Sequence, residues 1–190
     1  GMVTPLTMFL TEVEVIAGDA NQVLLNHVFP QLPYKEFWRA VCLLDPYGLH
    51  LEWEVISTAG HMKSIEIFIN FPIMDANRNA LWRHPDRVKD EDLARMTAFW
   101  GDDSWRRVAY SQQGTLFGSP EGVKLGNTDL VAAFRERLIR VAGFAHVPEP
   151  LPMRNSTNAV VYYLFFASPK EVAGSIVEEI MARYRSRGVE

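Results

Sequence analysis

The feature that most constrains the fold is an apolar run over residues 40–44 that ends in a turn carrying one acid. The run is apolar without alternation, which indicates a strand buried on both faces. Asp45 follows directly, and Pro46 and Gly48 then stop the strand, with Tyr47 between them. Ligands of open parallel sheets bind beyond the carboxyl ends of the strands, so this turn is a candidate site.

A second run, 64–71, has the same design and places Asn70 at a similar height in the sheet. Pro72 follows it, and a short helix predicted over 74–83 carries Arg78. Asn70 and Arg78 are candidate ligands of a substrate phosphate or carboxylate, because arginine suits bidentate anion contacts. A helix-capping or salt-bridge role explains the same residues equally well.

Ahead of these runs, residues 13–17 predict a short strand and 20–28 a helix. Asp19 lies between them, where it can cap the helix. A further helix is predicted over 51–59, with Gly60 near its end. The alternation of strands and helices predicts a parallel sheet with right-handed crossovers.

The last third of the chain predicts a hairpin and a final helix. A helix over 129–142 is followed by an extended segment, 144–153, a turn, and a strand over 159–167. The hairpin makes the last strand antiparallel to its neighbours. The final helix, capped by Ser168 and running to about Tyr184, is expected to turn its apolar residues inward; these are Val172, Ile176, Ile180 and Met181. The predicted fold class is a three-layer α/β domain with a mostly parallel sheet and an antiparallel C-terminal strand.

The segment 84–128 is polar and rich in turn formers, and predicts an insertion or a lid over one end of the sheet. It contains a predicted helix over 90–100. Its aromatic residues could stack on a base or form a satellite core under a long loop. They are Trp100, Trp105, Tyr110 and Phe117.

Length and charge narrow the class of protein. A chain of 190 residues predicts one domain, 2–190. The formal net charge of −4 gives no electrostatic case for nucleic-acid binding. Cys42 is the single cysteine, so no intrachain disulfide forms, and His61 and His84 lack the spacing of metal ligands. No apolar stretch reaches the ~20 residues that span a bilayer, and no signal-peptide pattern is present. These features favour a cytoplasmic protein.

Several segments together resemble one known family. They are Leu44-Asp45-Pro46-Tyr47-Gly48-Leu49, Glu52-Trp53, Ile69-Asn70-Phe71-Pro72, Asn77-Arg78-Asn79, Met153-Arg154-Asn155 and Tyr163-Leu164-Phe165-Phe166-Ala167-Ser168. In this order and spacing they resemble the three-Cys-motif partner family, the TcmP-like proteins. The resemblance implies a Rossmann-like fold of the S-adenosylmethionine-dependent methyltransferase type and a cysteine-rich, three-Cys-motif protein as partner.

The resemblance also implies roles for single residues. Asp45, Pro46 and Tyr47 match the Asn/Asp-Pro-Pro-Tyr turn of amino-methylating enzymes, with Tyr47 at the second proline of that pattern. In such enzymes the turn accepts hydrogen bonds from the amine and stacks on the acceptor. An acid at the position of Asp19 contacts the adenine amino group in this fold. The two function hypotheses are methyl transfer to an unknown acceptor and a non-catalytic protein that binds a cysteine-rich partner.

One departure from the family matters for both hypotheses. Family members usually begin with a strand that enters an Asp-x-Phe-Ala-Gly-Pro-Gly-like loop, and this sequence has no such loop. The chain therefore resembles the C-terminal two-thirds of the family domain, an N-terminally truncated form that lacks half of the cofactor pocket. A sheet without its first strand has a bare edge, which predicts a homodimer or an N-terminal segment that folds back over it.

Overall fold

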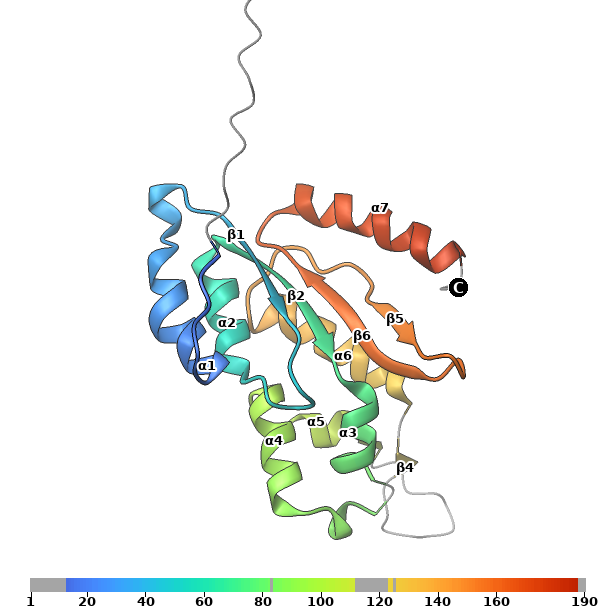
Figure 1. Ribbon diagram of the computed structural model, residues 1–190. Helices are drawn as coiled ribbons and strands as arrows, with labels where there is room; N and C mark the ends of the chain where they lie inside the picture. The colour runs from blue at the N-terminus through green and yellow to red at the C-terminus, as the bar shows by residue number, and fades with distance from the viewer. Residues whose placement is uncertain (1–12, 83, 112–122, 125, 188–190) are drawn as a thin grey trace, which may run out of the picture.

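A computed structural model describes residues 13–82, 84–111, 123–124 and 126–187 (Figure 1). Its main sheet has the order β1-β2-β6-β5, and a separate two-stranded sheet pairs β3 with β4. The strands are β1 (Ala40–Leu44), β2 (Ile65–Phe71), β3 (Tyr110–Ser111), β4 (Val123–Lys124), β5 (Leu151–Arg154) and β6 (Val160–Ala167).

The main sheet is mixed: β1 and β2 are parallel, whereas β6 is antiparallel to both of its neighbours, β2 and β5. Three of the four strands therefore point the same way, and the C-terminal strand is the antiparallel one, as predicted. This strand lies inside the sheet, between β2 and β5. The predicted hairpin, with its turn at 155–158, is confirmed and joins β5 to β6.

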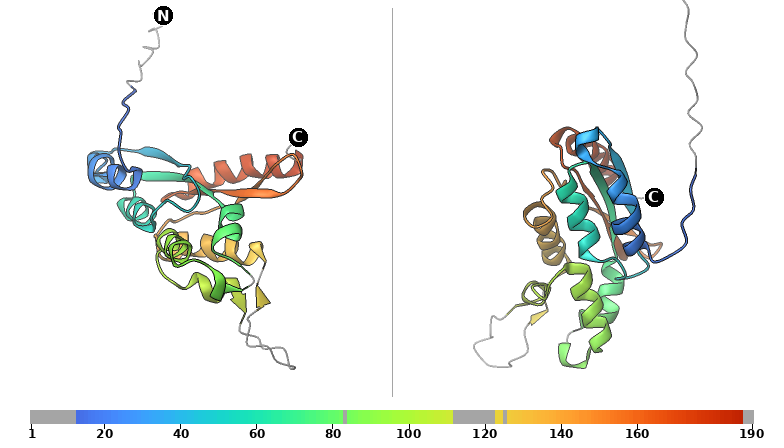
Figure 2. Two further views of the ribbon diagram at one scale, coloured as in Figure 1. Left: turned by 60° about the horizontal axis from the view of Figure 1, so that its bottom comes forward. Right: turned by 90° about the vertical axis from the view of Figure 1, so that its left-hand side faces the viewer.

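Helices cover both faces of this sheet (Figure 2). α2 and α6 lie on one face, and α7 lies on the other, over β6. The α-helices are α1 (Ala20–Val23), α2 (Trp53–Met62), α3 (Ile73–Asn79), α4 (Asp90–Trp100), α5 (Trp105–Ala109), α6 (Asn127–Arg140) and α7 (Glu171–Arg187). α1 continues as the π-helical turn η1 (Leu24–Val28), and the short 3-10 turns are η2 (Phe29–Gln31), η3 (Tyr34–Glu36) and η4 (Pro85–Arg87).

The hydrophobic core lies between the sheet and the α2–α6 layer. Alternate residues of β2 are fully buried in this core, namely Ile65, Ile67, Ile69 and Phe71. Phe134 of α6 is the centre of an aromatic cluster, with its ring 4.8 Å from that of Phe71 and 5.2 Å from that of Phe165. This packing fixes the register of β2 and therefore the height at which its end presents Asn70.

The aromatic residues of 84–128 belong to this core, so neither interpretation of them is right where the structure describes them. Trp100 and Trp105 are fully buried in the main cluster, and their indole N–H groups donate to Ser104 Oγ and Thr97 Oγ1. The Tyr110 hydroxyl donates to the Trp82 carbonyl at 2.7 Å. Phe117 lies outside the described residues.

The predicted first strand is wrong. Residues 13–17 form no regular element, and the side chains of Val13 and Val15 are 83% and 90% exposed. No described residue pairs with the outer edge of β1, because β1 is the terminal strand of the sheet. Residues 13–17 therefore have strand-forming side chains but no described strand to pair with.

The prediction that α7 turns its apolar residues inward is also wrong for most of them. Val172, Ile176 and Ile180 are exposed, and Met181 is the one predicted residue that is buried. α7 approaches His146 so closely that a Cβ at Gly174 would lie 1.9 Å from the imidazole ring. The contact face of α7 therefore runs through Gly174 and Met181, which rotates the stripe toward solvent.

One smaller correction concerns the end of α2, which extends past the predicted residue 59 to Met62. Gly60 therefore lies in its last turn, and Lys63 takes the left-handed conformation with φ 61°. A Cβ at Gly60 would lie 2.1 Å from the Ala142 carbonyl oxygen, so glycine is required for the close packing of α2.

Candidate functional site

A hollow of about 460 Å³ lies between the carboxyl end of β1 and the start of α1. It brings together four of the residues that the sequence singled out: Asp19, Asp45, Pro46 and Tyr47. The remaining lining residues are Gly18, Ala20, Asn21, Leu24, Leu43, Leu44, His50 and Leu51. Residues that are 26 positions apart thus share one site, at the end of the strand where ligands of α/β sheets bind.

Asp19 is an N-cap, as the simpler interpretation predicted. Its Oδ1 accepts the Gln22 backbone N–H at 3.0 Å, and the residue has extended φ and ψ. This bond satisfies one of the N–H groups that a helix start leaves open. Since a carboxylate offers about four acceptor positions, capping leaves Asp19 able to accept further hydrogen bonds in the hollow.

Asp45 is joined to Asn70 across the ends of the two parallel strands. Asn70 Nδ2 donates to Asp45 Oδ1 at 2.7 Å, and Asp45 itself is exposed. The register places Leu44 beside Ile69, so Asp45, the first residue after β1, lies next to Asn70 of β2. Asn70 therefore contacts the candidate acid directly and orients its carboxylate.

The loop that carries Tyr47 is held by Asn21, which the sequence analysis missed. Asn21 is buried, donates to the His50 carbonyl at 3.0 Å and accepts the Glu52 N–H at 2.9 Å. Gly48 has φ 59°, and a Cβ there would lie 2.7 Å from Asp75 Oδ2. These contacts give the loop one conformation although its tip is exposed.

Tyr47 extends from this loop into solvent, and His50 lies beside it. The Tyr47 side chain is 92% exposed, and its ring stacks on that of His50 with centroids 6.3 Å apart at 28°. Arg95 Nη1 lies 3.3 Å from His50 Nε2. An exposed, oriented aromatic ring beside a carboxylate can stack on a planar ligand. The one feature of the sequence that could have identified His50 as a site residue is its position, two residues after the Asp-Pro-Tyr-Gly turn.

Arg78 does not join this site. It is exposed on α3, where its carbonyl oxygen accepts the Trp82 indole N–H, and it does not line the hollow. Cys42, on β1 behind the site, is half-buried, and burial raises the pKa of its thiol to about 11. The thiol is therefore protonated at neutral pH and a weak nucleophile.

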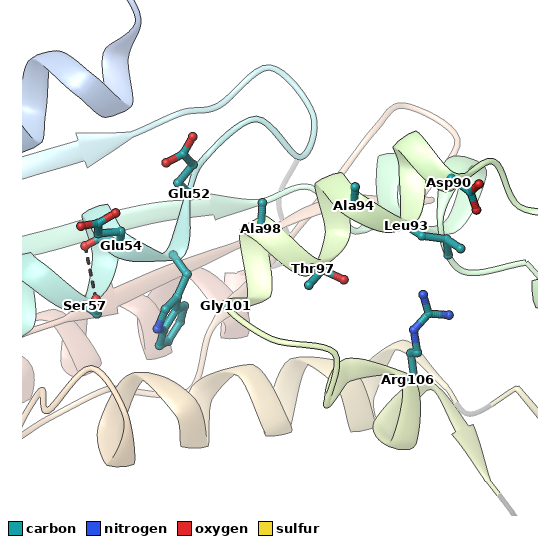
Figure 3. Close-up of a pocket in the computed structure, with 11 residues that line it drawn as sticks. Glu52, Glu54, Ser57, Asp90, Leu93, Ala94, Thr97, Ala98, Gly101 and Arg106 are labelled. Atoms are coloured by element: carbon teal, nitrogen blue, oxygen red, sulfur yellow. Dashed lines mark hydrogen bonds between the residues drawn. The ribbon is translucent and has the colours of Figure 1, made fainter.

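A larger hollow of about 750 Å³ lies between α2, α4 and α5 (Figure 3). Its lining includes Trp53 and three carboxylates. Glu52 and Glu54 lie at one end, and Asp90 lies at the other, on the side of Arg106 (Figure 3). The Arg106 guanidinium lies 4.6 Å from the Trp105 ring centroid. None of the candidate site residues from the sequence lines it.

Comparisons with known proteins leave the chain without an assigned family. No family model matches the sequence, and no curated protein or solved structure is significantly similar to it. Within the described ranges, no group of His, Cys, Asp or Glu side chains converges as a metal site would require. The described helices include none with the length and apolar character needed to cross a bilayer. The site therefore has to be interpreted from its own residues.

Proposed function

We propose that the 460 Å³ hollow binds S-adenosylmethionine and that the protein transfers its methyl group to an amine. The observation that carries the proposal is the convergence of Asp19, Asp45 and Tyr47 on one hollow. Bound S-adenosylmethionine would supply an electrophilic methyl group on a sulfonium sulfur. The proposal also takes the fold as methyltransferase-like, supported by parallel strands that finish in an antiparallel hairpin.

The residues of the hollow fit the nucleoside and sulfonium parts of this ligand. Its volume lies within the ~300–1,000 Å³ usual for small-molecule sites. Leu24 and Leu43 offer apolar surface for a base, and Asp19 offers an acceptor for an exocyclic amino group. Two carboxylates favour a cationic ligand through their charge. Asp19 and Asp45 thus have complementary roles at the two ends of the hollow.

Asp45, Pro46 and Tyr47 act on the amine in this proposal. The Asp45 carboxylate and the Pro46 carbonyl accept N–H bonds from the amine, which orients the nitrogen lone pair. Tyr47 stacks on a planar acceptor and excludes water from one of its faces. Asp45 then holds the proton that the nitrogen sheds. Asn70, by its bond to Oδ1, keeps the carboxylate in place.

A non-catalytic role is the second candidate, in which the protein binds a cysteine-rich, three-Cys-motif protein. One feature of the hollow favours it. The lining contains no Lys or Arg to hold the carboxylate of S-adenosylmethionine, and residues 13–39 contain a single glycine, Gly18. The backbone cradle that other nucleotide folds build from glycines is therefore not formed by these described residues.

Calorimetric titration with S-adenosylmethionine, S-adenosylhomocysteine and adenosine separates the two candidates. The methyl-transfer proposal predicts micromolar binding of the first two, weakened at least tenfold in Asp19→Asn, whose asparagine keeps the helix cap. Asp103→Asn is the matched control, an exposed carboxylate outside the hollow, and should bind as the parent does. Absence of binding for all three ligands would reject the cofactor role and favour the partner-binding role.

A further inference from the structure

The outer edge of β1 presents unpaired backbone groups. The Ala40 N–H donates to the Ser64 carbonyl at 2.9 Å, so alternate residues of β1 bond to β2. The N–H and C=O groups of Val41 and Leu43 therefore point to the open edge, where no described strand lies. The same two side chains are 59% and 76% exposed. An apolar, unpaired edge of this kind tends to pair with another chain.

The side chains along this edge form a self-complementary pattern. Val41 and Leu43 are the odd positions of β1 and share the face away from α2. Arg39 and Asp45 flank the strand on its two sides and are exposed as well. In chain order these four positions are cationic, aliphatic, aliphatic and anionic.

We propose that two copies of this chain pair antiparallel along β1, with Cys42 opposite the partner's Cys42. In this register Val41 faces the partner's Leu43, and Arg39 faces the partner's Asp45. Cross-strand aliphatic and opposite-charge pairs both stabilise antiparallel strands. The two main sheets become one continuous sheet across a two-fold axis, with the same surface used by both copies.

The charges select this register over its neighbours. Edge hydrogen bonds require odd positions to face odd positions, so the alternatives are shifted by two residues. One shift places Arg39 opposite the partner's Leu43, and the other places Asp45 opposite the partner's Val41. Either leaves a charge against an aliphatic side chain and separates the ion pair. The proposed register alone pairs the aliphatic residues with each other and the two charges with each other.

The neighbouring helical segment leaves the edge accessible. η1 packs on α2, and the 460 Å³ hollow separates the start of α1 from the end of β1. A second hollow of about 220 Å³ borders the beginning of β1, between Val41 and Pro169. The face of β1 that carries the odd side chains is thus open at both ends of the strand.

Pairing has a consequence for the candidate site, and this consequence rests on the proposed function. In the proposed register the partner's Arg39 lies opposite Asp45, at the border of the 460 Å³ hollow. Each site then contains an arginine from the other copy, which supplies the cation that the hollow lacks within one chain. The ligand carboxylate would meet that guanidinium, so the dimer completes the site.

Sedimentation equilibrium of the full chain, without cofactor, tests the pairing between 1 and 200 µM. The parent protein should sediment at twice the monomer mass. Leu43→Lys should raise the dimer Kd at least tenfold, because it places a charge on the edge. Val172→Lys is the matched control, since Val172 is exposed to a similar degree, 73%, on α7. It should leave the Kd unchanged, and circular dichroism should show both variants folded.

Charge exchange tests the register. Arg39→Asp and Asp45→Arg alone should each raise the Kd, because like charges then face each other, and the double variant should restore it. A monomeric parent, a dimer insensitive to Leu43→Lys, or a double variant that stays dissociated would each overturn the proposal. Because the mass is measured without S-adenosylmethionine, failure of cofactor binding leaves this result unaffected.

Discussion

Asn70 Nδ2 donates a 2.7 Å hydrogen bond to Asp45 Oδ1 and so joins the carboxyl ends of β2 and β1. The neutral amide matters, because an acid at the same place would oppose the Asp45 charge. Asn70→Asp should therefore lower the free energy of unfolding at pH 7 by about 0.5–1 kcal/mol, a typical size for charges at a partly exposed site. The loss should vanish near pH 3, where one carboxyl group is protonated.

Urea unfolding at both pH values measures this effect. Asn26→Asp is the matched control, since the exposed Asn26 donates to Gln22 Oε1 at 3.0 Å and faces no carboxylate in that bond. It should show little dependence on pH. An equal loss at pH 3 and pH 7 in Asn70→Asp would contradict the electrostatic explanation.

Asp19 allows its capping and ligand-binding roles to be separated. Asp19→Ala should lower the free energy of unfolding by about 1 kcal/mol, because the Gln22 N–H loses its acceptor. Asp19→Asn should lower it by only a few tenths, since asparagine is an equally good N-cap. Thermal unfolding measures both variants. If asparagine destabilised as much as alanine, the charge and not the cap would be the stabilising feature.

Arg137 connects the α6 helix to the loop at Asp102. Its guanidinium lies 4.8 Å from the Trp53 ring centroid, and Nη2 lies 3.0 Å from Asp102 Oδ2. Although partial desolvation pushes the Asp102 pKa upward, hydrogen bonds from Ser104 and the Arg137 charge outweigh it and lower that pKa. The stability from Asp102 is therefore complete above its unfolded pKa of about 4 and is lost as the pH falls through the folded pKa.

Arg137→Met should remove much of this pH dependence and keep the apolar stem over the rings. The free energy of unfolding of the parent should fall between pH 4 and pH 2 more steeply than that of the variant. Arg140→Met, on the same helix, removes only an exposed ion pair with Glu136 and should keep the parent slope. Parallel pH profiles for the parent and Arg137→Met would contradict the role of this pair.

Gly60 tests how closely α2 packs against the loop after α6. In Gly60→Ala the new Cβ would meet the Ala142 carbonyl oxygen at 2.1 Å, a backbone atom that cannot rotate away. The expected loss is about 1–3 kcal/mol in the free energy of unfolding. Gly126→Ala is the control, since its nearest neighbours are side-chain atoms at 3.4 Å or beyond. Equal thermal stability of the two variants would contradict this packing.

Sequence patterns predicted the position of several elements along the chain. The apolar run of β1, the longer run of β2 and the strand β6 all lie where the sequence placed them, to within a residue. α4 spans the predicted 90–100. The apolar residues of β2 and the buried residues of α4 meet one core, so their patterns have one stable solution. The prediction that β1 is buried on both faces is wrong: β1 is the terminal strand of the sheet, and Val41 and Leu43 are 59% and 76% exposed. The turn after β1 was equally clear, since Pro46 and Gly48 leave few other conformations.

Tertiary structure decided the elements for which a neighbour matters. Residues 13–17 have strand-forming side chains but no described strand beside them, and strands exist only as pairs. α7 has an apolar stripe, yet its position is fixed by the contact of Gly174 with His146, which turns the stripe outward. Neither outcome follows from local periodicity. Periodicity predicts which residues share one face of a helix or strand, but it does not predict which other element packs against that face.

The candidate site divides in the same way. The sequence by itself determined that Asp45 and Asn70 end two adjacent strands and that Asp19 begins a helix, because turn and cap chemistry are local. Only the tertiary structure decided that Asp19 and Tyr47 share one hollow and that Asn21 holds the loop that carries Tyr47. The same is true of Arg78, which does not line the hollow. These relations depend on how helices pack on the sheet, and that packing is set by contacts between residues distant in the chain.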